Sequence, residues 1–185
     1  MIYPIRAYGD PVLRSKCEEI IHFDEDLEQL IENMYQTMDA SDGVGLAAPQ
    51  IGRSIRLFMI DSTHFKHEDS NAGIRQVFIN PQIMEETGEE WSFEEGCLSI
   101  PDVRDVVYRK PTIRLRYQTV SGEQKEEVYD GMNARVIQHE YDHIEGVLFI
   151  DHISAFKRQL IKSKLNNISR GKINVHYRMK FPKRS

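Results

Sequence analysis

The stretch HEYDH at residues 139–143 constrains this chain most, because it sets two imidazoles four residues apart with a carboxylate directly after the first. Residues four apart share one face of a helix, so both histidines can bind one divalent metal. Glu140 then lies where a general base could take a proton from a metal-bound water. We therefore predict a helix between the N-cap Asp130 and the terminator Gly146 that carries a hydrolytic metal site. The alternative is a chance match on an ordinary surface helix.

Two histidines do not complete a metal site, so a third ligand is needed. One class of zinc peptidases continues the motif as HExxHxxGxxH, and this chain follows that pattern through Gly146 but has Phe149 in place of the last His. A downstream Glu is also excluded, because Asp151 is the last acidic residue of the chain. The best upstream candidate is Cys97, in a turn at the end of a strand, since two His and one Cys with an open water position form a catalytic set. Cys17 lacks such surroundings and is interpreted as a small buried residue.

A third stretch, GVGLAAPQ at residues 43–50, is rich in small residues. Two glycines and two alanines in so short a run indicate that the backbone closely approaches another group. Gln50 offers a neutral amide donor, which suits an oxyanion hole. The alternative is a tight turn whose small residues pack beneath a helix.

Together these stretches resemble the motifs of the peptide deformylase family. The family patterns GxGLAAxQ, EGCLS and QHExDH match, in the same order, residues 43–50, 95–99 and 138–143. With DPVLR at 10–14 and EGVLFID at 145–151, the resemblance covers roughly residues 1–155. It implies a metal-dependent hydrolase that removes the N-formyl group from the formylmethionine of nascent polypeptides and releases formate.

The resemblance also implies roles for individual residues. Cys97, His139 and His143 would bind the metal, and a metal-bound hydroxide would attack the formyl carbon, with Glu140 as general base and later proton donor. The Gln50 side chain and the Leu98 backbone N–H would stabilise the oxyanion.

Substrate and metal are also implied by the resemblance. The Gly45 backbone would pair with an extended N-formylmethionyl peptide. By position, Val44 and Val136 would line the methionine pocket, although both also suit a plain core. Asp142 would hold an imidazole or an Arg beside the ligands, and Arg109 is interpreted as a structural ion pair. Family members use Fe²⁺ and accept Zn²⁺, Ni²⁺ or Co²⁺, whereas the ligand types alone would suit zinc.

Composition narrows the class of protein. The 185 residues fit one catalytic domain, 1–185, and the net charge of −5 argues against DNA as a partner. No run approaches the ~18 apolar residues of a membrane span, so we expect no membrane partner. Two cysteines leave no disulfide framework, which is typical of a cytoplasmic protein.

The C-terminal segment, residues 152–185, differs from the rest in charge. It holds ten Lys or Arg and no Asp or Glu, so it carries about +10 while the preceding residues carry about −15. One interpretation is a cationic face that complements an acidic body. The other is a contact with ribosomal RNA, whose phosphates would bind such a segment.

The periodicity predicts an α+β fold of mixed or antiparallel strands around the central metal-binding helix. Expected helices cover 10–13, 23–40 and 154–167, with a terminal strand through 173–179. Expected strands cover 54–61, 76–84, 105–107, 112–119 and 124–129. The polar segment 62–75 is predicted to be a loop, so its histidines, His64 and His67, are interpreted as solvated.

Two rival functions remain open at the level of sequence. A zinc peptidase would cleave ordinary amide bonds, but it should have the third His or Glu that this chain lacks. A metal-stabilised module that docks on ribosomes without catalysis would need a closed site of four protein ligands, and it would have no use for Glu140.

Overall fold

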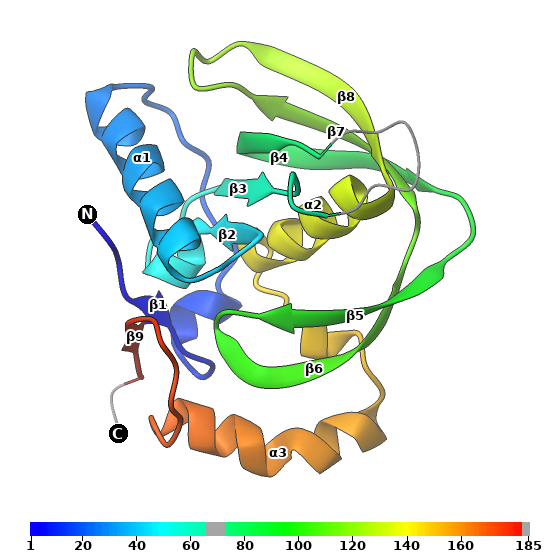
Figure 1. Ribbon diagram of the computed structural model, residues 1–185. Helices are drawn as coiled ribbons and strands as arrows, with labels where there is room; N and C mark the ends of the chain where they lie inside the picture. Colours follow the sequence, from blue (N-terminus) through cyan, green and yellow to red (C-terminus); the bar gives the residue numbers. More distant parts are fainter. Residues whose placement is uncertain (66–72, 183–185) are drawn as a thin grey trace.

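The computed structural model describes residues 1–65 and 73–182. Helix α2 (Gly131–Ile144) lies at the centre, between a five-stranded antiparallel sheet and the separate hairpin β5–β6 (Figure 1). Helices α1 (Glu25–Ala40) and α3 (Ala155–Ser169) lie at the periphery. The predicted α+β class, with strands around a central helix and a C-terminal helix, is confirmed.

The main sheet places its shortest strand at an edge, next to α2. Its order is β2 (Gly45–Ala47), β3 (Leu57–Asp61), β4 (Arg75–Thr87), β7 (Thr112–Gln118) and β8 (Gln124–Asp130). The hairpin consists of β5 (Trp91–Cys97) and β6 (Ile100–Arg109), and β1 (Ile5–Arg6) pairs in parallel with β9 (Met179–Lys180). Short 3-10 helices cover η1 (Pro11–Arg14), η2 (Ala48–Ile51) and η3 (Phe149–Asp151).

Strand β3 is buried on both faces, whereas the sequence predicted a simple alternation. Leu57 and Met59 pack in one core cluster with the apolar stripe of α1. Phe58 and Ile60 pack in a second cluster with the inner face of α2. Because α1 covers one face and α2 the other, all five residues of the strand are buried. Strand β2 pairs with β3 in antiparallel orientation.

Helix α1 begins after Asp24, whose Oδ1 accepts a hydrogen bond of 3.0 Å from the Leu27 N–H. The predicted start at Phe23 is therefore two residues early. Capping by Asp satisfies a backbone N–H that the first turn would otherwise leave unpaired.

The C-terminal segment packs less closely than the helix pattern indicated. Phe156 and Leu160 on α3 are 73% and 67% exposed, while Leu165 and Ile168 are buried in the core. Beyond α3, residues 173–180 alternate between half-buried and exposed, as predicted for a strand, but only β9 forms ladder pairs. His67 of the predicted loop and Lys183 and Arg184 of the basic segment lie outside the described residues.

No helix in the described part of the chain, residues 1–65 and 73–182, combines the length and the apolar character of a bilayer span.

Candidate metal centre

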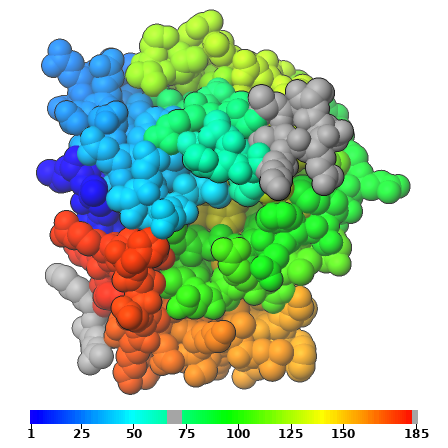
Figure 2. All heavy atoms as spheres, viewed as in Figure 1, coloured from blue at the N-terminus to red at the C-terminus, as the bar shows by residue number. Residues whose placement is uncertain are grey.

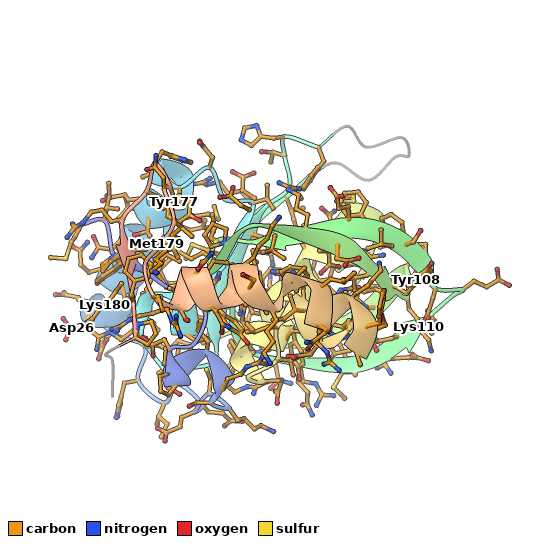
Figure 3. All side chains as sticks on the ribbon, turned by 90° about the horizontal axis from the view of Figure 1, so that it is seen from below. Asp26, Tyr108, Lys110, Tyr177, Met179 and Lys180 are labelled. Atoms are coloured by element: carbon orange, nitrogen blue, oxygen red, sulfur yellow. The ribbon has the colours of Figure 1, made fainter. Side chains whose placement is uncertain are left out.

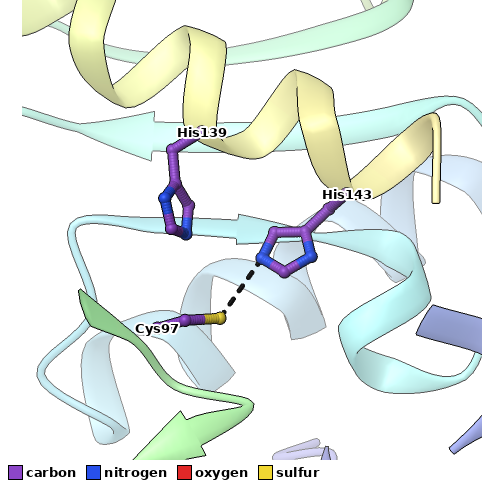
Figure 4. A group of neighbouring side chains, drawn as sticks. All are labelled: Cys97, His139 and His143. Carbon is purple, nitrogen blue, oxygen red and sulfur yellow. Dashed lines mark hydrogen bonds between the residues drawn. The ribbon is translucent and has the colours of Figure 1, made fainter. Parts of the chain in front are cut away.

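Cys97, His139 and His143 meet at one point although they come from two separate elements. The ligand atoms of the three residues lie within 4.8 Å of one another, and the Sγ of Cys97 is 3.3 Å from the Nε2 of His143 (Figure 4). The two histidines are one turn apart on α2, with ring centroids 5.2 Å apart. This spacing suits three ligands of one tetrahedral metal ion.

Cys97 reaches α2 because it lies two residues after Glu95 on β5, so both side chains share the face that meets the histidines of α2. At this point Gly96 pairs with Arg104 but Cys97 pairs with Ile100, so β6 carries the extra residues. Such a bulge bends the strand that carries it.

Glu95 is a site residue that the sequence reasoning missed. Its Oε2 lies 3.0 Å from the Nδ1 of His139, which leaves the Nε2 of that ring for a metal. Arg109 donates two hydrogen bonds to Glu95, of 2.8 and 3.0 Å, and Arg135 donates another of 3.0 Å. Carboxylates that hold ligand histidines in this way fix the ring and its tautomer.

Asp142 contacts both an arginine and an imidazole, the two alternative partners expected for it. Its Oδ2 lies 2.9 Å from the Nη1 of Arg109 and 2.7 Å from the Nε2 of His152. Arg109 therefore links the buried Glu95 to the half-buried Asp142. Each of these charges has a partner of opposite sign, which offsets part of the cost of burying it.

Charges at the centre favour a cation. Burial opposes ionisation of Cys97, but the adjacent His143 and His139 outweigh it and lower the pKa of the thiol to about 5. Burial raises the pKa of Glu140 to about 7. Among the described residues, the Oε2 of Glu140 and the Nδ1 of His143 are buried without a hydrogen-bond partner. A thiolate, two imidazoles and an unpaired carboxylate oxygen fit a divalent transition metal with room for a further ligand.

Gln50 points its amide at this centre. Its Oε1 accepts a hydrogen bond of 2.8 Å from the Ala47 N–H, which turns the Nε2 toward the Sγ of Cys97 at 3.5 Å and the Oγ of Ser99 at 3.3 Å. The side chain is 2% exposed, so its direction is fixed by packing and by this bond. A fixed donor is what an oxyanion hole requires.

Gly45 is required because the backbone closely approaches Glu140. A Cβ atom at this position would overlap the carboxylate of Glu140, so no other residue fits without moving the carboxylate. Since β2 is an edge strand that pairs only with β3 in the sheet, its other side faces the cleft. Of the small residues in this stretch, Gly43 and Gly45 allow close approach at the site, whereas Ala47 and Ala48 are buried in the core clusters.

The centre opens into a cleft of about 1130 Å³. Figure 2 shows a hollow between the cyan atoms around β2 and the green atoms of β5 and β6, with the yellow atoms of α2 at its floor. The walls include these predicted site residues: Val44, Gly45, Gln50, Cys97, Leu98, Val136, His139 and Glu140. Val44 is 39% exposed and Val136 only 6%, and His143 lies beneath the surface of the cleft.

The chain matches one family along most of its length. A family model described as polypeptide deformylase matches residues 2–159. A peptide deformylase of Christiangramia forsetii is 56% identical over 98% of this chain and 97% of that protein. One of Thermotoga petrophila is 47% identical, covering 91% of this chain and 98% of that protein.

Solved structures agree with the sequence matches. A crystal structure of a peptide deformylase from Legionella pneumophila superposes with a TM-score of 0.82 at 39% identity, covering 93% of this chain and 98% of that one. One from Thermotoga maritima gives a TM-score of 0.75 at 45% identity, covering 83% and 99%.

Proposed function

This chain belongs to the polypeptide deformylase family, and we propose from this premise that it removes the formyl group from the N-terminal formylmethionine of nascent polypeptides. The reaction is hydrolysis of a formamide, with formate and a free N-terminal amine as products. The observation that carries the proposal is the meeting of Cys97, His139 and His143 beside Glu140 in an open cleft.

The family is metal-dependent, and the Cys-His-His group supplies a suitable donor set. We propose Fe²⁺ as the resident ion, with Zn²⁺, Ni²⁺ or Co²⁺ as substitutes. When bound, such an ion acts as a Lewis acid and makes water a stronger acid. Held by Glu95 through its Nδ1, His139 would bind the ion through its Nε2, and the Cys97 thiolate would supply a negative charge.

Glu140 is the proposed carrier of the proton. Its buried carboxylate, with a pKa raised to about 7, can take a proton from water and give it up again near neutral pH. Its Oε2 has no partner among the described residues and is therefore available to water. The same group would pass the proton to the departing amine.

Gln50 and the Leu98 backbone N–H are the proposed donors to the oxyanion that forms on the formyl oxygen. The amide of Gln50 is already directed at the centre before substrate binds, so no reorganisation is needed. Leu98 follows Cys97 directly in the chain and lines the same cleft, which supports its N–H as the second donor.

The open edge of β2 supports strand-like binding of the peptide at Gly45. Val44 and Val136 both line the cleft, and we propose that they contact the methionine side chain. Val136 is almost fully buried, so it would form the floor of this pocket, and the more exposed Val44 would form its rim.

The test is formate release from a formylmethionyl peptide, compared with cleavage of the same peptide without the formyl group. We expect formate from the first and no amide cleavage of the second, using protein purified without oxygen and analysed for metal. A zinc peptidase would cleave the second peptide, and a docking module would cleave neither.

We further propose that residues 1–185 act as one catalytic domain in the cytoplasm, where nascent chains are made. Its two free cysteines suit reducing conditions.

The exposed basic residues of α3, with Lys157, Arg158 and Lys162 among them, support a contact with ribosomal RNA. Such a contact should weaken as salt rises, so co-sedimentation with ribosomes that is equal at low and high salt would exclude it.

Replacing Glu95 with Gln should weaken metal binding by about 10- to 100-fold, because His139 loses its charged partner. Arg109 and Arg135 would also lose a buried carboxylate, so we expect a lower Tm. A metal titration followed by calorimetry measures the affinity, and a calorimetric thermal scan measures the Tm. Glu90→Gln, on an exposed residue of the loop before β5, is the matched control, and equal metal affinity in the two variants would contradict the role of Glu95.

A further inference from the structure

Leu98 and Ser99 form the turn between β5 and β6, directly after Cys97. The register changes between Gly96 and Cys97, so Cys97–Ile100 is the ladder pair that closes the turn. Bonds from distant segments also hold the turn. The Tyr8 N–H donates to the Ser99 carbonyl at 2.8 Å, and the Gln50 amide contacts the Ser99 hydroxyl.

The C-terminal segment supplies a further bond to this turn. The hydroxyl of Tyr177 donates to the Leu98 carbonyl at 2.8 Å. Burial, and then the nearby charges of Cys97 and Asp102, raise the pKa of Tyr177. The phenol therefore stays protonated and serves as a donor. On its other side, the Leu98 side chain packs so closely on Gly43 that a Cβ there would lie 2.9 Å from the Leu98 Cδ1.

Tyr177 is itself held in place by its neighbours in the chain. The Ile5 N–H donates to the Arg178 carbonyl at 2.8 Å, and β9 pairs with β1 directly afterwards. Figure 3 shows Tyr177, Met179 and Lys180 together at one end of the molecule, far from Tyr108 and Lys110 at the other. Residues 174–177 line the cleft, so the segment reaches the site that it supports.

From these contacts we propose that Tyr177 is a positioning residue: it fixes the Leu98 carbonyl and so restrains the backbone of Leu98, the residue whose N–H, on the preceding peptide unit, would donate to the reacting formyl oxygen. This inference rests on the proposed function. A donor displaced by a fraction of an ångström stabilises the transition state less, while ground-state binding of the peptide changes little. The β1–β9 pairing would thus couple the far end of the chain to the oxyanion site.

The test is Tyr177→Phe, which keeps the ring and its packing and removes only the hydroxyl. We expect kcat to fall about tenfold with KM and metal content nearly unchanged. The matched control is Tyr108→Phe, on a residue that is 63% exposed, and it should behave as the wild type. An unchanged kcat would overturn the proposal. A raised KM with unchanged kcat would also overturn it, because Tyr177 would then only form a wall of the cleft that binds the peptide. A loss of metal content in proportion to the loss of kcat would overturn it as well.

A second readout separates this proposal from the proposed function. In ¹⁵N NMR spectra of the diamagnetic zinc-loaded protein, Tyr177→Phe should shift the Leu98 and Ser99 amide signals and increase their mobility. Tyr108→Phe should leave them in place. A wild type that releases no formate would refute the proposed function, whereas unshifted Leu98 and Ser99 signals would refute the role of Tyr177.

Discussion

Glu140→Ala should retain its metal and lose nearly all turnover, with kcat lower by about 10²- to 10⁴-fold, the usual contribution of a general acid–base. Glu140 is not among the three residues that could hold the metal, so metal content should stay at the wild-type level. Rates of formate release and metal analysis on the same samples measure both quantities.

Stability provides a further check on Glu140. Burial raises the pKa of its carboxylate, so the folded protein disfavours the charge that the proposed general base requires. Replacement by Ala removes this buried carboxylate, and we therefore expect a Tm equal to or above that of the wild type. Glu123→Ala, at an exposed turn, should change neither rate nor Tm. Wild-type turnover by Glu140→Ala would remove the general base from the mechanism.

The helix of the site could be predicted because its geometry is local. Spacing of four residues on a helix fixes how two histidines face each other, whatever the rest of the chain does. Cys97 was identified by elimination of downstream ligands, and the structure brings it to α2. Glu95 was missed because no boundaries were predicted for β5. Glu95 lies two residues before Cys97 on β5, so both side chains share the face that meets α2. A predicted strand through these residues would therefore have identified Glu95.

Long-range packing explains where the fold differed from expectation. The alternation around residues 54–61 predicted one buried face, but β3 is covered by α1 on one side and α2 on the other. The stripe of α3 predicted contact along the helix, yet Phe156 and Leu160 stay exposed because only its C-terminal half reaches the core. Local periodicity does not specify which elements meet.

Gln50→Leu should lower kcat by about 10²- to 10³-fold, equivalent to about 2.7–4 kcal/mol, because one fixed donor to the oxyanion is lost. Metal content should not change, since Gln50 contacts Cys97 through an N–H and is not a ligand. The same substitution leaves the buried Ala47 N–H without its acceptor, so a loss of about 1–3 kcal/mol in stability should accompany it.

Comparing the change in kcat with the change in KM shows whether Gln50 stabilises the transition state or the bound substrate. A donor that meets the oxygen only when it becomes negative stabilises the transition state more than bound substrate, so kcat should fall while KM changes little. Gln159→Leu, on the exposed side of α3, controls for the loss of an amide elsewhere. A raised KM with unchanged kcat would mean that Gln50 binds the ground-state peptide, and the oxyanion would then need another donor.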